Sequence, residues 1–94
     1  MRLVGTELLA EFAAQHADIR HALSAWICEV EDADWIGPRD IKARYPSASV
    51  LSDNRFVFNI RGNKYRLETK VSFELKVVLV KQMGTHSEYL KWKL

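Results

Sequence analysis

The sequence predicts a small α+β domain in which two N-terminal helices pack on one face of an antiparallel-rich sheet. Two changes along the chain predict this class. Apolar residues recur at helical spacing through the first half, and the spacing becomes a period of two after residue 54. The length of 94 residues suits one domain spanning residues 1–94. The expected order of elements is β-α-α-(α)-β-β-β.

The first half begins with a short apolar strand over residues 1–4, followed by two amphipathic helices. We expect these helices over residues 6–16 and 18–34, with Thr6 and Asp18 as their N-terminal caps. The apolar positions of the second helix follow the i, i+3, i+4 pattern of a buried stripe. They are Ile19, Ala22, Leu23, Trp26, Ile27 and Val30.

The second half predicts a third short helix and three strands. A proline at the first position and a Tyr-Pro pair at the end bound the helix at residues 38–44. Alternating residues predict strands over 55–61 and 64–73, joined by a two-residue turn at Gly62-Asn63. The last strand, over 77–83, is nearly all apolar, which predicts burial on both faces.

The two-residue turn fixes the register of this hairpin. We expect Asn59 opposite Arg66, and Arg55 opposite Lys70. The outward face of the hairpin, which points away from the core, then carries several basic residues and only one acidic residue, Glu68. These are Arg55, Arg61, Lys64, Arg66 and Lys70. Either this face is simply solvated and its charges are screened by salt, or a bound polyanion neutralises those charges.

The distribution of charge favours a polyanion. The formal net charge is only +2, but residues 1–37 hold two basic and seven acidic residues, a net charge of −5. Residues 38–94 hold twelve basic and five acidic residues, a net charge of +7. A basic sheet backed by acidic helices attracts phosphate backbones.

A histidine and a tyrosine follow the last strand at the end of the sheet. His86 has a side chain whose ordinary pKa suits proton transfer near neutrality, and Tyr89 would share its side of a helical turn. Together with the basic face they form a metal-free set suited to RNA cleavage. That reaction needs a base for the 2′-hydroxyl, an acid for the leaving 5′-oxygen and cations on the phosphate. Alternatively, His86 caps or packs at the strand end.

Other classes of function lack support in the sequence. His16 and His21 have no third ligand at suitable spacing, so no metal site or cofactor is expected. Cys28 is the only cysteine, which suits a reducing cytosol. No apolar run approaches the ~20 residues of a membrane span, and the first residues do not form a signal peptide. We therefore expect a cytoplasmic protein with no membrane partner.

Two segments, FNIRGNKYRL at residues 58–67 and GTHSEY at residues 84–89, together resemble the HigB toxin family of the RelE/ParE-like superfamily. The resemblance implies the RelE-like small sandwich fold. It also implies the toxin of a type II toxin–antitoxin system, an endoribonuclease that cleaves mRNA without a metal on translating ribosomes. The implied partners are mRNA, the ribosome and a HigA-like antitoxin with a helix-turn-helix domain.

The resemblance implies catalytic roles for Arg66, His86 and Tyr89. Arg66 would stabilise the phosphate, with His86 as the first choice for base and Tyr89 as acid or positioning group, although these two roles could be exchanged. The residues expected to bind RNA are Asn59, Arg61, Lys64, Lys70 and Lys91. The alternatives are a non-catalytic RNA- or ribosome-binding module and a gyrase-directed ParE-like toxin. His86, Tyr89 and the basic sheet argue against the gyrase-directed branch.

Overall fold

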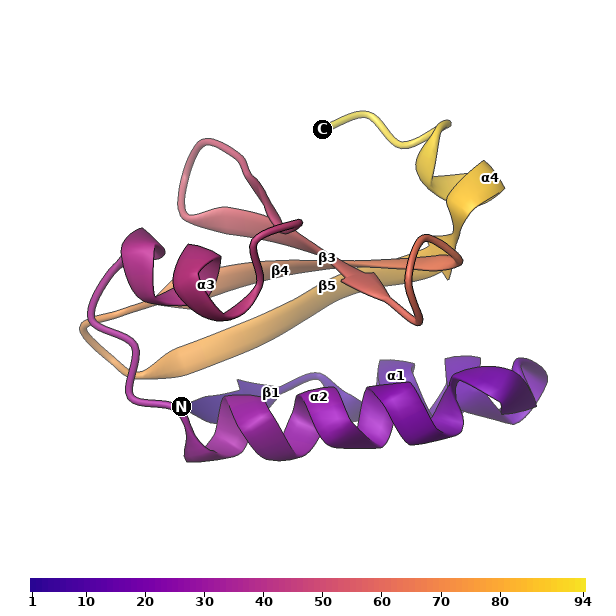
Figure 1. Cartoon of the computed structure of the whole chain (residues 1–94), viewed down its shortest axis with the longest axis horizontal. Coiled ribbons are helices and arrows are strands. Elements are labelled where there is room, and N and C mark those ends of the chain that lie inside the picture. Colours follow the sequence, from indigo (N-terminus) through magenta and orange to yellow (C-terminus); the bar gives the residue numbers. More distant parts are fainter.

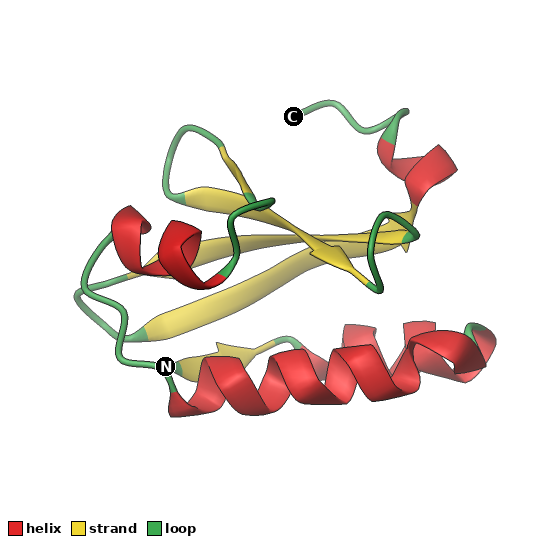
Figure 2. Ribbon diagram, viewed as in Figure 1, coloured by secondary structure: helices red, strands yellow, loops and turns green.

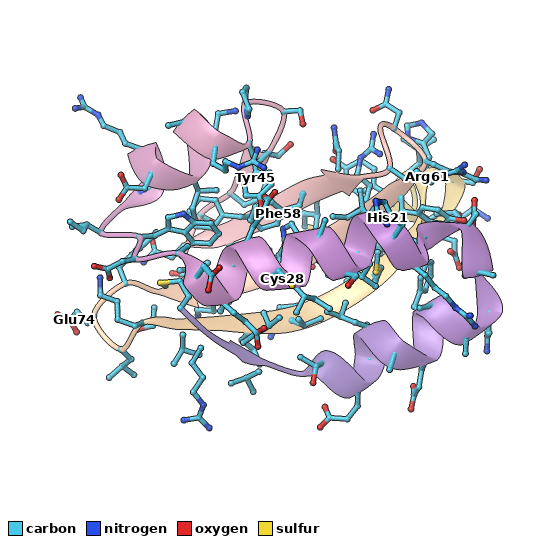
Figure 3. The ribbon with its side chains drawn as sticks, turned by 60° about the horizontal axis from the view of Figure 1, so that its bottom comes forward. His21, Cys28, Tyr45, Phe58, Arg61 and Glu74 are labelled. Carbon is cyan, nitrogen blue, oxygen red and sulfur yellow. The ribbon has the colours of Figure 1, made fainter.

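Two layers make up the protein: a five-stranded sheet and two helices that cover one of its faces. The computed structural model describes all 94 residues. Helices α1 (Thr6–Gln15) and α2 (Arg20–Asp32) lie side by side along the sheet and are joined by a 3₁₀ turn at Ala17–Ile19 (Figures 1 and 3). The short helix α4 (His86–Tyr89) and the end of the chain lie on the opposite face (Figure 2).

The sheet has the strand order β1-β5-β4-β3-β2. Strand β1 (Arg2–Val4) runs parallel to β5 (Val77–Thr85), and the remaining neighbours are antiparallel. Those neighbours are β4 (Tyr65–Ser72), β3 (Arg55–Ile60) and the two-residue β2 (Ser49–Val50). The predicted α+β class and antiparallel-rich sheet are confirmed, and β2 and α4 are added to the expected order.

The hydrophobic core lies between the helices and the sheet. The apolar stripe of α2 faces inward as predicted, with Trp26 and Val30 buried. The Trp26 ring meets Phe58 of β3 edge to face at 5.3 Å. Helix α3 (Pro38–Arg44), whose bounds match the prediction, buries Ile41 in the same core. Tyr45, which follows α3, packs its ring against Phe58 at 5.2 Å (Figure 3).

The ends of two elements differ from the prediction. Helix α2 ends at Asp32, because Ala33 already has an extended backbone. Thr6 does not cap α1: it is the first helical residue, and the N-cap is Gly5 with a φ of 92°. A glycine suits this left-handed position, where an added Cβ would also lie 3.2 Å from the carbonyl oxygen of Val80.

The expectation that the last strand is buried on both faces is wrong. Strand β5 continues to Thr85, and Val78 and Val80 are buried on the helical side. Leu79, which points the other way, is 36% exposed. The apolar run therefore reflects one core-facing row and one partly exposed row.

Asp18 connects the helical layer to the turn of the sheet hairpin instead of capping a helix. It lies within the 3₁₀ turn, and its Oδ2 accepts hydrogen bonds from Arg61 Nη1 at 2.8 Å and from Lys64 Nζ. Its Oδ1 accepts a hydrogen bond from Tyr65 Oη at 2.6 Å. The hydrogen bond from Lys64, followed by that from Tyr65, lowers the pKa of Asp18 from 3.8 to about 2.

Replacing Asp18 with asparagine is expected to lower the melting temperature in a pH-dependent way. The pKa of Asp18 is about 2 in the folded protein, below its ordinary 3.8. Its stabilising effect is therefore complete above the ordinary pKa and is lost as the pH falls through 3.8 towards 2. Thermal unfolding of the wild type and of Asp18→Asn, at neutral and progressively acidic pH, measures the difference between their melting temperatures. A melting-temperature difference that stayed constant across that window would contradict the assignment.

Candidate active site

The register of the sheet hairpin is the one predicted, but its turn is longer. Asn59 pairs with Arg66 and Arg55 with Lys70, and the last paired residues are Ile60 and Tyr65. The turn therefore spans residues 61–64 and not two residues. It is closed by a hydrogen bond from Lys64 N to Arg61 O at 3.2 Å, and Arg61 and Gly62 both have positive φ.

The prediction that Arg61 and Lys64 lie on the outward face of the hairpin is wrong. Both residues belong to the turn, so the alternation of strand side chains does not apply to them. Their side chains reach Asp18, which lies between α1 and α2 on the helical side. Two of the five cations expected on the outward face therefore lie on the helical side, where Asp18 partly neutralises them.

The outward face is also not an open basic surface. Arg66 is 7% exposed, Glu68 is 5% exposed and Val57 is 1% exposed, although Val57 lies outside the hydrophobic core cluster. The end of the chain runs over this side of the sheet (Figure 1). Arg55 Nη2 donates to the carbonyl oxygen of Leu94 at 3.0 Å, so the two are in direct contact.

Arg66 is a buried cation held by neutral groups. Its Nη1 donates to the carbonyl oxygen of Asn63 at 2.7 Å, and its Nη2 donates to Asn63 Oδ1 at 3.1 Å. The Tyr89 ring lies against the guanidinium, with the centroid 5.1 Å from Cζ. No carboxylate oxygen lies within 4.0 Å of the Arg66 nitrogens. Since buried charges are nearly always paired, this guanidinium lacks the anion it would ordinarily have.

Glu68 could have neutralised Arg66 but binds elsewhere. It lies two residues along β4 on the same face, where its Oε1 accepts a hydrogen bond from Gln82 Nε2 at 2.6 Å. Its Oε2 lies 3.6 Å from Arg55 Nη1. The carboxylate is therefore occupied, and it does not neutralise Arg66.

Helix α4 holds His86 and Tyr89 at its first and last positions. Thr85 is its N-cap and forms a capping box with Glu88: Glu88 N donates to Thr85 Oγ1 at 3.2 Å, and Thr85 N donates to Glu88 Oε1 at 2.8 Å. The Thr85 N–H bond is the main cause that lowers the pKa of Glu88. His86 N also donates to Lys64 O at 3.0 Å, which ties α4 to the hairpin turn.

The His86 side chain is exposed and makes no hydrogen bond. It is neither the cap of α4, which is Thr85, nor part of the core. The structure therefore does not support the alternative in which His86 caps a helix or packs at the end of the strand. An exposed imidazole at this end of the sheet is available for proton transfer.

The structure brings only some of the predicted residues together. Arg66 and Tyr89 are in contact, and Asn59 is the cross-strand neighbour of Arg66. Lys70 is exposed but lies four residues further along β4, about 13 Å from Arg66. Lys91 is exposed beyond α4, near enough to Glu88 to contribute to the lowering of its pKa.

Two residues at this end of the sheet were missed by sequence reasoning. Asn63 contacts Arg66, but an asparagine after glycine indicated only a turn. His16 was expected to be an ordinary surface residue, yet its ring stacks on Phe12 at 4.2 Å and meets Tyr65 at 5.5 Å. Its charge also contributes to lowering the pKa of Glu88. Nothing in the local sequence around His16 signals this position.

No three histidine, cysteine, aspartate or glutamate side chains gather as the ligands of a metal ion would. His21 and Cys28 are separate, exposed residues of α2 (Figure 3). None of the helices is both long enough and apolar enough to cross a membrane.

Comparison with known proteins finds one matching family and several similar proteins. Residues 19–92 match the family described as HigB_toxin, RelE-like toxic component of a toxin-antitoxin system. The chain is 28% identical over 91 residues to the mRNA interferase toxin HigB of Escherichia coli strain K12, an alignment that covers 95% of this chain and 88% of that relative. Proteins named mRNA interferase HigB from Escherichia coli O157:H7 and Shigella flexneri match with the same identity and coverage.

Proposed function

The chain belongs to the HigB toxin family, the RelE-like toxic component of a toxin–antitoxin system, and on that premise we propose that it is an mRNA interferase. It is an endoribonuclease that cuts mRNA and thereby inhibits translation. A toxin of this family has an antitoxin partner. We propose a HigA-like antitoxin with a helix-turn-helix domain, ribosome-bound mRNA as substrate, the cytoplasm as location, and one domain spanning residues 1–94.

The unpaired charge of Arg66 is the observation that carries this proposal. A guanidinium that is 7% exposed, with no carboxylate within 4.0 Å, is a binding site for an anion. A phosphodiester supplies that anion, and its two non-bridging oxygens can accept a pair of hydrogen bonds from the planar guanidinium. The Tyr89 ring lies against the guanidinium, and His86 belongs to the same short helix α4. A phenol and an imidazole are groups that can move the protons of a phosphodiester reaction.

The proposed reaction is attack of the RNA 2′-oxygen on the neighbouring phosphorus. The bond from phosphorus to the 5′-oxygen breaks, leaving a 2′,3′-cyclic phosphate and a free 5′-hydroxyl. His86 removes the 2′-hydroxyl proton, and Tyr89 donates a proton to the leaving 5′-oxygen or positions the substrate. The assignment of base and acid between His86 and Tyr89 could be reversed. Arg66 stabilises the charge that develops on the phosphate oxygens, and no metal ion takes part.

The remaining contacts are proposed for the RNA backbone. Asn59 is the cross-strand neighbour of Arg66, Lys70 is an exposed cation further along β4, and Lys91 is an exposed cation that follows α4. The side chains of Arg61 and Lys64 are 49% and 54% exposed, so they offer the backbone a weaker attraction while bound to Asp18. The four cations contribute through salt-dependent attraction, not through base recognition.

Mapping the 5′ ends of cellular mRNA after induction of the protein tests the function. New 5′-hydroxyl ends within coding regions are expected, and they should be absent when a His86→Ala variant is induced to the same level. A non-catalytic RNA- or ribosome-binding module would inhibit translation without creating ends. A gyrase-directed toxin would cause DNA damage while mRNA remained intact. Either of these results would refute the proposal.

A further inference from the structure

The hydrogen-bond donors of Arg66 are used unevenly. A guanidinium has five N–H groups. Both hydrogens of Nη1 are engaged, by the carbonyl oxygen of Asn63 at 2.7 Å and that of Tyr65 at 3.3 Å. One hydrogen of Nη2 binds Asn63 Oδ1 at 3.1 Å. The second Nη2 hydrogen and the Nε hydrogen remain, and this pair of donors matches two oxygens of a phosphate.

Asn63 contacts the guanidinium twice, through its backbone and through its side chain. Any residue at position 63 would supply the backbone oxygen, but only an oxygen-bearing side chain supplies the second acceptor. The conformation of the turn does not itself demand asparagine, because the positive-φ positions are Arg61 and Gly62. The side chain of Asn63 is therefore explained by its contact with Arg66 and not by the turn.

The turn that carries Asn63 is supported on both sides. Arg61 and Lys64 bind Asp18 of the helical layer, and the carbonyl oxygen of Lys64 accepts the N–H of His86 in α4. An acceptor on such a support fixes the orientation of its donor better than one on a loose loop. The Tyr89 ring against the guanidinium restricts the remaining rotation.

We propose that Asn63 is a positioning residue that orients the guanidinium of Arg66 so that its Nε and Nη2 hydrogens bind the scissile phosphate as a pair. This inference rests on the proposed cleavage of RNA. Asn63 itself does not touch the substrate. Its loss leaves Arg66 charged and present, but without the acceptor for Nη2 that helps to hold the geometry the transition state needs.

The test compares Asn63→Ala with Asn63→Gln, which retains a neutral amide oxygen as an acceptor for Nη2. We expect Asn63→Ala to lower kcat about tenfold while KM stays within about twofold, since orientation matters most in the transition state. Asn63→Gln should stay within about threefold of the wild-type kcat. Ser87→Ala, a change at an exposed residue of α4, is the control and should leave kcat unchanged. Equal melting temperatures verify that the variants are folded.

A second background shows whether Asn63 acts through Arg66. In the Arg66→Lys protein, which has no guanidinium to orient, adding Asn63→Ala should change kcat by less than about twofold. A further tenfold loss in that background, or an unchanged kcat for Asn63→Ala alone, would overturn the proposal.

The nuclear magnetic resonance signals of the Arg66 guanidinium provide a readout that does not depend on activity. Restricted rotation should give separate Nη hydrogen signals in the wild type, and these should merge in Asn63→Ala. If the wild type cleaves no RNA, the proposed function fails, and this measurement alone decides the positioning role. Identical guanidinium signals in the two proteins would then refute it.

Discussion

Replacing Arg66 with alanine is expected to lower the rate of RNA cleavage by about 10²–10³-fold, because one preorganised group that stabilises transition-state charge is lost. The folded protein should tolerate the change. No carboxylate depends on Arg66 for neutralisation, so its removal leaves no buried anion unpaired. Single-turnover cleavage of a defined RNA, together with thermal unfolding, measures both effects.

Two companion variants separate charge from geometry at this position. Arg66→Lys keeps a cation but has no planar pair of donors, so an intermediate loss of about tenfold or more is expected. Arg55→Ala removes another cation of the same face, one that pairs with buried Glu68. It should lower the melting temperature more than Arg66→Ala does, with a cleavage rate close to that of the wild type. A wild-type rate for Arg66→Ala would remove Arg66 from the site.

Replacing His86 with alanine is expected to abolish growth arrest and to slow cleavage by about 10²–10⁴-fold, the usual contribution of a general base or acid. The fold should be preserved, because the exposed imidazole makes no hydrogen bond and α4 keeps its capping box. Growth after induction and single-turnover cleavage provide the two measurements.

His21→Ala is the matched control for this experiment, since His21 is an exposed histidine of α2 on the other side of the sheet. It should retain full toxicity. Cleavage by the wild type should persist in excess EDTA, as expected if His86 and Tyr89 carry the protons and no metal ion is needed. Full toxicity of His86→Ala would show that the base lies elsewhere, and a Mg²⁺ requirement in the chemical step would refute the metal-free reaction.

Local patterns predicted the register of the hairpin, and the start of α4 carries a local signal that the prediction did not use. The alternation of residues 55–60 and the Gly-Asn turn fix which residues pair, so Asn59 opposite Arg66 follows from short-range rules. Thr85 and Glu88 stand three apart, which is the spacing of a capping box and is readable without a structure.

Local sequence patterns did not predict the environment of the charged residues. Asp18 looked like a helix cap, but its three donors come from residues 43 to 47 positions away, and no local rule links them. Arg66 looked exposed because the outward face of an isolated hairpin is exposed. Its burial depends on how the end of the chain packs, with Tyr89 over the guanidinium. Contacts between segments that are far apart in the sequence determine both the partners of Asp18 and the burial of Arg66.

The parallel pairing of β1 with β5 has a consequence for the order of folding. It joins residues 2 and 77, so nearly the whole chain must close into a loop before β1 gains its partners. Strands β3, β4 and β5 are connected by short turns and can associate at much lower entropic cost. Arg66, His86 and Tyr89 all lie on this quickly closing part of the chain. The groups proposed for chemistry can therefore assemble before the N-terminal strand docks, and we expect substitutions in β1 to change the rate of unfolding more than the rate of folding.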